Sequence, residues 1–239
     1  MIIAGMATMP SRIHTAPRSI ASILPQVDRL WLCLDGFDSV PDFAKHPKII
    51  CEFSRDHGGL RAEGKFLGLA LDEKAEVYVS TDDDLLYPKD YVRRLMFLNR
   101  ILPGRVAVGC HGSVFRPQVQ SYVKDRKVRN VRRMQLMPWR KVDVLATNGS
   151  VHFVRDLRFD PRKWAHRNQV DLNFMEESLG QGLRFVTAAR TRNWVRALEV
   201  KQQDSIFSAL LQDDSVQTAR IKDLLSRRAL SDVSASGSK

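Results

Sequence analysis

Short apolar runs alternate with amphipathic segments through the first half of the chain. The run from Leu30 to Leu34 is apolar at every position, which is typical of a strand covered on both faces of its sheet. Similar runs predict strands at 2–6, 48–53, 77–79 and 106–108. Their regular spacing predicts a sheet whose strands are separated by other elements.

Apolar residues between these runs recur at helical spacing. They predict helices over residues 13–24, 60–71 and 88–102, with Pro88 at the first position of the last one, where its missing N–H costs nothing. Alternating strands and helices imply parallel strands joined by right-handed crossovers. We therefore expect an α/β fold with a Rossmann-like, mostly parallel twisted sheet flanked by helices.

The second half of the chain is less regular. Residues 142–153 resume strand character, and residues 171–182 predict a helix that stops at one of two glycines. Two further helices are expected around residues 206–211 and 221–225.

The domain organisation follows from these elements. We expect residues 1–200 to form the main domain and residues 201–230 to form a small helical part packed on it. Residues 231–239 are rich in serine and are expected to form a flexible tail.

The chain is strongly basic. Lys and Arg number 38 against 27 Asp and Glu, so the formal net charge is 38 − 27 = +11. Such an excess favours a polyanionic partner, which could be nucleic acid, an anionic membrane surface or a phosphorylated substrate. No apolar run is long enough to span a membrane and no signal sequence is evident, so we expect a cytoplasmic protein.

Much of the positive charge lies between Arg116 and Lys141, where nine basic residues accompany the single acid Asp125. The stretch has no sustained period, and we expect a loop. It could grip donor phosphates, an anionic glycan, a polyprenyl diphosphate or the inner membrane surface, or it could simply be solvated. Only Tyr122 and Trp139 are interleaved with the basic residues, which disfavours nucleic acid.

Three consecutive aspartates, Asp82, Asp83 and Asp84, follow the predicted strand at residues 77–79. Adjacent like charges destabilise one another unless a cation or hydrogen-bond donors compensate. In an extended backbone Asp82 and Asp84 point to one side and Asp83 points away into the scaffold. Two carboxylates on one side suit a shared hard cation, Mn²⁺ or Mg²⁺, or one metal ion and one ribose hydroxyl. The alternative is a polar turn that caps the following helix.

The segment Val77–Val92 resembles the Asp-x-Asp region of glycosyltransferases with the glycosyltransferase-A fold, and is most similar to bacterial family-2-like enzymes that build capsules and lipopolysaccharides. Three further segments are similar to this family in the same order: Ala7–Arg12, Leu34–Gly36 and Gly58–Phe66. The resemblance covers about residues 1–200 and implies a glycosyltransferase-A catalytic domain.

The resemblance also implies roles for individual residues. Asp84 would ligate the metal, and Asp82 would contact the metal or the ribose. The nucleotide-sugar donor would be held by residues of the four matching segments: Thr8, Pro10, Arg12, Asp35, Lys65, Asp82 and Asp83.

An inverting transferase needs a carboxylate that deprotonates the acceptor hydroxyl. Asp171, at the start of a predicted helix, is in the place where the family carries this base, although Val170 replaces the usual acidic neighbour. The alternative for Asp171 is a charge that stabilises the helix N-terminus, so inverting and retaining chemistry both stay open. Asn148 and Gly149 resemble a turn that lines the acceptor pocket, and His152 is a further acceptor candidate.

These observations predict a metal-assisted glycosyltransferase. It would use a nucleotide diphosphate-sugar, UDP-sugar by default, and transfer the sugar to a glycan or a polyprenyl-diphosphate-linked acceptor in surface polysaccharide synthesis. Peripheral contact with an anionic membrane is compatible with the charge. The alternatives are a sugar-phosphate nucleotidyltransferase, although the segment Thr8–Ser11 is poor in glycine for that role, and a basic module that binds nucleic acid or membrane.

Overall fold

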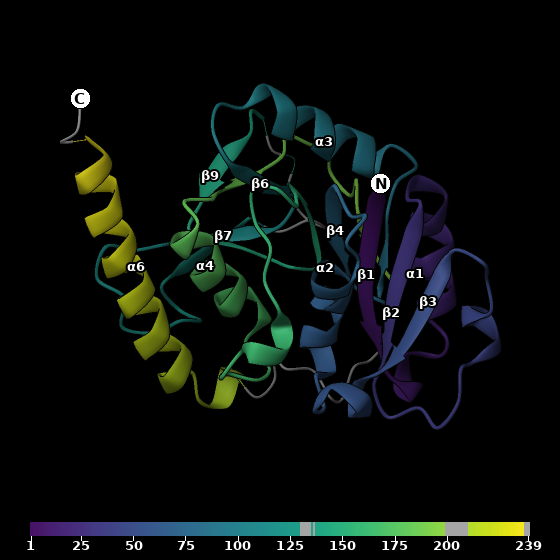
Figure 1. The fold of residues 1–239 in the computed structure, drawn as a ribbon. Helices are drawn as coiled ribbons and strands as arrows, with labels where there is room; N and C mark the ends of the chain where they lie inside the picture. The colour runs from purple at the N-terminus through teal and green to yellow at the C-terminus, as the bar shows by residue number, and fades with distance from the viewer. Residues whose placement is uncertain (130–134, 136, 199–209, 237–239) are drawn as a thin grey trace.

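The fold was analysed in a computed structural model, which describes residues 1–129, 135, 137–198 and 210–236 (Figure 1). The strands are β1 Ile2–Thr8, β2 Arg29–Leu34, β3 Ile49–Phe53, β4 Val77–Thr81, β5 Leu85–Leu86, β6 Val106–Gly109, β7 Gly112–Phe115, β8 Arg126–Arg129, β9 Arg140–Val142, β10 Val144–Leu145, β11 Gly149–Phe153, β12 Arg184–Thr187 and β13 Arg196–Ala197. The α-helices are α1 Ala16–Ile23, α2 Leu67–Leu71, α3 Tyr91–Ile101, α4 Val170–Gly180 and α6 Ser215–Ser236. Short 3₁₀ helices occupy Pro10–Arg12, Leu24–Gln26, Asp42–Ala44, Ser54–His57, Arg61–Phe66 and Pro161–Lys163.

The main sheet has eight strands in the order β3-β2-β1-β4-β11-β6-β12-β9. Six of them run in one direction, and β11 and β9 run in the other. The predicted α/β fold with a mostly parallel sheet flanked by helices is therefore confirmed. The part of the sheet with the order β3-β2-β1-β4 has a strand order that is common in doubly wound sheets. In such sheets ligands bind where the strand order reverses, beyond the carboxyl ends of the strands. Here the reversal lies between β1 and β4.

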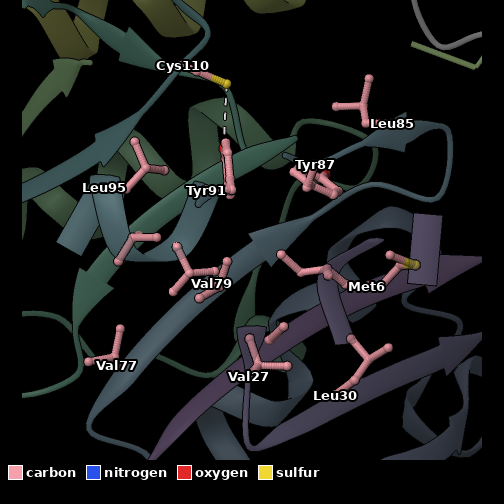
Figure 2. Packing of buried hydrophobic residues seen from close by; sticks show 14 of the residues in the cluster. Met6, Val27, Leu30, Val77, Val79, Leu85, Tyr87, Tyr91, Leu95 and Cys110 are labelled. Carbon is pink, nitrogen blue, oxygen red and sulfur yellow. Dashed lines mark hydrogen bonds between the residues drawn. The ribbon is translucent and has the colours of Figure 1, made fainter. Parts of the chain in front are cut away.

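Successive side chains of a strand point to opposite faces of the sheet, so each inner strand contributes to two hydrophobic cores, one on each face. Met6 and Val79 enter the core that α1 and α3 cover, and Figure 2 shows them in the same cluster as Leu95 of α3. Tyr78 enters the core on the other face, where it stacks with Phe66, and Phe174 of α4 continues that aromatic cluster. The fully apolar runs of the sequence thus reflect strands that are covered on both sides.

The start of α3 differs from the prediction. The helix begins at Tyr91 after an N-cap at Asp90, so Pro88 precedes it and is not its first residue. The intervening β5 pairs with β13, which keeps the chain extended directly after the aspartates. This pairing joins residues distant in sequence and could not be read from local spacing.

The prediction that the basic stretch from Arg116 to Lys141 is a loop is partly wrong as well. Within it, β8 pairs with β7 and β9 pairs with β12, while residues 130–134 and 136 lie outside the described residues. Backbone pairing satisfies N–H and C=O groups whatever the side chains are. Strands can therefore form here without the alternating apolar pattern by which a strand is recognised in a sequence.

The C-terminal part packs on the sheet domain through α6. Ile221 and Leu224 are buried in the core shared with α4, and Arg220 and Arg227 both form ion pairs with Glu176 of α4. The helix expected around residues 206–211 lies mostly outside the described residues. The predicted tail is helical as far as Ser236. In the part of the chain that the structure describes, no helix has the length and apolar character needed to cross a bilayer.

Packing of α2 on β2 gives a test of the fold. A Cβ on Gly68 would clash with the Trp31 indole, whereas a Cβ on Gly180 of α4 would meet no atom within 4 Å. Gly68→Ala should therefore lower the free energy of unfolding by about 1–3 kcal/mol through overpacking. The matched change Gly180→Ala should be neutral or stabilising by up to about 1 kcal/mol. Urea denaturation measures both, and equal effects would contradict this packing.

Candidate functional site

A cavity of about 890 Å³ opens at the point where the strand order reverses. The carboxyl ends of β1 and β4 supply Thr8 and the aspartate triplet, and the segment after β1 supplies Arg12. Lys65 comes from the 3₁₀ helix before α2, and Asp171 comes from the first turn of α4. Segments far apart in the sequence therefore meet at the edge of the sheet where doubly wound folds bind ligands.

The three aspartates form a turn between β4 and β5, and all three line the cavity. The expectation that Asp83 faces away into the scaffold is therefore wrong, because the alternation of an extended strand ends at Thr81. Hydrogen bonds hold the turn: the Ser19 hydroxyl donates to the carbonyl of Asp82 at 2.7 Å, and the Asp82 N–H donates to the Tyr87 hydroxyl at 2.8 Å.

Asp82 forms a close ion pair with Lys65. Burial alone would lower the pKa of Lys65, but the carboxylates of Asp82, Asp171 and Asp83 together raise it above its ordinary value. The ammonium therefore stays charged and neutralises part of the acidic cluster. This pairing engages one of the carboxylates that the sequence assigned to the metal.

The pKa of Asp83 is strongly raised. Burial raises its pKa from 3.8 to about 7, and the Asp82 and Asp84 carboxylates add to the rise against the opposing effects of Thr8 and Arg12. The Arg12 Nε lies 4.0 Å from the Asp83 Oδ1, so its compensation is weak. A cation in the cavity would relieve this repulsion.

Asp171 is held by a single residue of the loop before β11. The Thr147 N–H and hydroxyl both donate to Oδ1 of Asp171, each at 2.8 Å. No hydrogen bond from the described residues reaches Oδ2. Burial raises the pKa of Asp171, while Thr147 and Lys65 limit the rise. Asp171 lines the cavity, and a carboxylate with a raised pKa and one oxygen that no described residue occupies can accept a proton.

The acidic turn suits a divalent cation only in part. Its donors are carboxylate oxygens, which Mg²⁺ and Mn²⁺ prefer. Among the described residues, no group of three or more His, Cys, Asp or Glu side chains forms a ready-made metal site. Mg²⁺ is commonly held by one or two carboxylates together with substrate phosphates. With Asp82 paired to Lys65, the turn still offers two carboxylates, those of Asp83 and Asp84.

The other predicted site residues divide into two groups. Thr8, Arg12, Asp35 and Asn148 line the cavity with the acidic residues. Pro10, Gly149 and His152 are not among the residues that line it.

The position of His152 has a physical explanation. Its ring is fully buried, packs against Tyr78 and Phe174, and has its pKa lowered by burial to about 4. Gly149 is needed for packing, since a Cβ there would clash with the Tyr91 hydroxyl. The expectation that these two residues contact an acceptor is therefore not supported by where they lie.

Several lining residues were not among the site residues predicted from the sequence. Tyr122 and Arg126 form part of the cavity wall, with the Arg126 guanidinium 5.2 Å from the centre of the Tyr122 ring. The N-terminal end of α6 holds this wall: the Tyr122 N–H donates to the Thr218 hydroxyl at 2.8 Å. Arg61 also lines the cavity and has a positive φ of 51°, a strained conformation of the kind that clusters at functional sites. The only sequence feature that could have predicted this wall was the presence of Tyr122 close to Arg126 within the basic run.

Comparison with known proteins adds little to this geometry. No protein-family model matches the chain, and no curated protein is significantly similar to it in sequence. Among solved structures, the 4-diphosphocytidyl-2C-methyl-D-erythritol synthase of Anaerococcus prevotii is 13% identical with a TM-score of 0.48, over 89% of this chain and 97% of that one. A mannosyltransferase from Pyrobaculum calidifontis, in complex with GDP-mannose and Mn²⁺, is 14% identical with a TM-score of 0.48, over 100% of this chain and 75% of that one. At this level neither similarity indicates a function.

The raised pKa of the half-buried Asp83 carboxylate makes stability depend on pH. The folded protein binds this proton more tightly than the unfolded chain does, so the contribution of Asp83 to stability falls as pH rises from 3.8 to about 7. Without divalent metal, Asp83→Asn should be more stable than wild type above pH 7, by up to about 4 kcal/mol. The difference should vanish below about pH 4.

Denaturation at several pH values in the presence of a chelator measures this difference. Asp213→Asn is a contrasting control, because hydrogen bonds from Ser215 lower the pKa of that surface carboxylate. Its loss should cost stability at high pH. An Asp83→Asn variant no more stable than wild type at pH 8 would show that the triplet is not strained.

Proposed function

We propose that the chain is a glycosyltransferase of the A fold, which transfers a sugar from a nucleotide diphosphate donor to a glycan or lipid-linked acceptor. One observation carries the proposal: the aspartate turn, the basic residues Arg12 and Lys65, and Asp171 converge on one cavity at the reversal point of the sheet. By resemblance of its sequence, UDP is the default nucleotide and bacterial capsule or lipopolysaccharide synthesis is the setting.

The donor occupies the side of the cavity formed by β1 and β2. Asp35 and Thr8 lie at the carboxyl ends of these strands, and we assign them to the base and ribose of the nucleotide. The diphosphate then faces Arg12, whose guanidinium suits phosphate oxygens. Asp82, oriented by Lys65, is left for the ribose hydroxyls.

Asp84 and Asp83 are the carboxylates that we assign to a Mn²⁺ or Mg²⁺ ion. Asp83 gains most from a cation, since burial and its two acidic neighbours oppose its ionisation. When bound, the ion neutralises the charge that develops on the leaving diphosphate. The positively charged side chains of the cavity act on the same charge.

Asp171 is the proposed base. Its Oδ2 takes the proton of the acceptor hydroxyl as that oxygen forms a bond to the anomeric carbon of the sugar. The bond from this carbon to the diphosphate oxygen breaks, and the diphosphate leaves with the electron pair. Thr147 holds Oδ1 and so fixes the orientation of the carboxylate. This assignment makes the enzyme inverting.

The acceptor then enters along the wall formed by Tyr122 and Arg126. Burial raises the pKa of Tyr122 far above neutrality, and the nearby Asp171 carboxylate adds to the rise, so its hydroxyl stays protonated. A protonated tyrosine hydroxyl close to the proposed base is a hydrogen-bond donor that suits a sugar oxygen.

Replacing the proposed metal ligand tests the donor side. Asp84→Asn should abolish Mn²⁺-dependent release of nucleoside diphosphate from a nucleotide sugar, while its circular dichroism and melting curve stay those of a folded protein. Asp38→Asn, a matched change on a residue that does not line the cavity, should keep wild-type turnover. Undiminished turnover in Asp84→Asn would refute the proposal. Release of pyrophosphate from a nucleoside triphosphate and a sugar phosphate would indicate a nucleotidyltransferase instead.

Replacing the proposed base tests the acceptor side. Asp171→Asn should lower kcat for sugar transfer by about 10²–10⁴-fold, the usual contribution of a general base. Its binding of nucleoside diphosphate should change little. The control Glu177→Gln lies on the same helix and keeps an oxygen that can accept the bond from the Trp164 indole, so it should transfer sugar normally. If Asp171→Asn retained full kcat, the carboxylate would serve only the helix N-terminus.

A further inference from the structure

The outer face of α3 carries a combination of side chains that the proposed chemistry does not use. Phe97 and Ile101 are 64% and 58% exposed, although both are large and apolar. Arg93 and Arg100 are exposed on the same face, at helical spacing from the two apolar residues. None of these four residues lines the cavity.

This face is rigidly presented. The opposite side of α3 places Val92 and Leu95 in the core, and the side chain of Asn99 donates to the carbonyl of Val106 at 2.6 Å. The helix therefore cannot rotate to bury Phe97 and Ile101 without exposing its core residues. Arg93, Phe97 and Ile101 follow one another at intervals of four residues and form a row about 12 Å long. In Figure 1 the helix runs along the upper edge of the molecule.

Arg94 lies beside the row, and its charge is offset by a neighbouring acid. Its guanidinium stacks on the Trp194 ring at 4.6 Å from the centroid and forms a 3.5 Å ion pair with Asp90. Arg93 and Arg100 form no ion pair with the described residues. The face thus combines two outward apolar side chains with an excess of positive charge.

We propose that this face of α3 docks on an anionic lipid bilayer. Membrane-surface helices pair basic side chains, which bind acidic headgroups, with large apolar side chains, which enter the headgroup and acyl boundary. The formal net charge of +11 adds a long-range attraction to the same partner. A second copy of the chain is disfavoured as the occupant, because a symmetric contact would bring the arginines of two helices together.

The proposal does not depend on the chemistry of the cavity. Its test is flotation of the whole chain with vesicles of phosphatidylcholine alone or of phosphatidylcholine mixed with phosphatidylglycerol. Wild-type protein should float with the anionic vesicles at low salt, be released at high salt, and stay unbound with the neutral vesicles.

Two variants of α3 separate the apolar and the charged contributions. Phe97→Ser with Ile101→Ser should weaken binding to anionic vesicles by about tenfold or more. Arg93→Glu should weaken it by about tenfold as well. The matched controls on α6 are Leu230→Ser, which removes a leucine that is 72% exposed, and Lys222→Glu, which makes a similar change of charge. Both controls should bind like wild type.

The outcomes are decisive in each direction. Melting temperatures of all four variants should match wild type, because the altered side chains are exposed. Failure of the wild type to float with anionic vesicles at low salt, or equal binding of the α3 variants and wild type, would overturn the proposal. A wild-type oligomer that Phe97→Ser with Ile101→Ser converts to a monomer in gel filtration would overturn it too, and would identify the face as a contact between copies.

Discussion

The mutual repulsion of Asp82, Asp83 and Asp84 at the end of β4 is the constraint on which the site depends. The sheet places the three carboxylates where the strand order reverses, and all three line the cavity there. Lys65 neutralises part of this charge, and burial keeps the pKa of Asp83 near 7. The repulsion that remains is the reason for which we propose a cation at this site. The proposal rests on electrostatics and does not require a known relative.

The rest of the cavity is arranged around that charge. Lys65 interacts both with the turn and with Asp171. The carboxylates of Asp82 and Asp171 each raise the pKa of Lys65, and all three residues line the same cavity. Thr147 orients Asp171, and α6 holds Tyr122 on the facing wall. The C-terminal helix, distant in sequence from the aspartates, therefore contributes to the site by fixing the wall.

The sequence predicted the parts of the fold that depend on local pattern. Apolar runs located β1, β2, β4 and β6, which lie inside the sheet and are covered on both faces, and also the half-buried edge strand β3. The apolar run of β4 also drew attention to the aspartate turn, because three charged residues follow that buried strand directly. The orientation of Asp83 was predicted wrongly, because the pairing of β5 with β13 joins residues far apart in the chain. The core position of His152 and the cavity wall at Tyr122 likewise depend on tertiary packing, which no local pattern encodes.

The central claim is that the acidic turn binds a nucleoside diphosphate through a divalent cation. Titration calorimetry of wild-type protein with UDP and other nucleoside diphosphates, with Mn²⁺ and with a chelator, tests it most directly. We expect one nucleoside diphosphate to bind in the presence of Mn²⁺ and to bind far more weakly in its absence, with Asp83 releasing its proton at pH values below about 7. Equal binding with and without the metal, or no binding of any nucleoside diphosphate, would contradict the account.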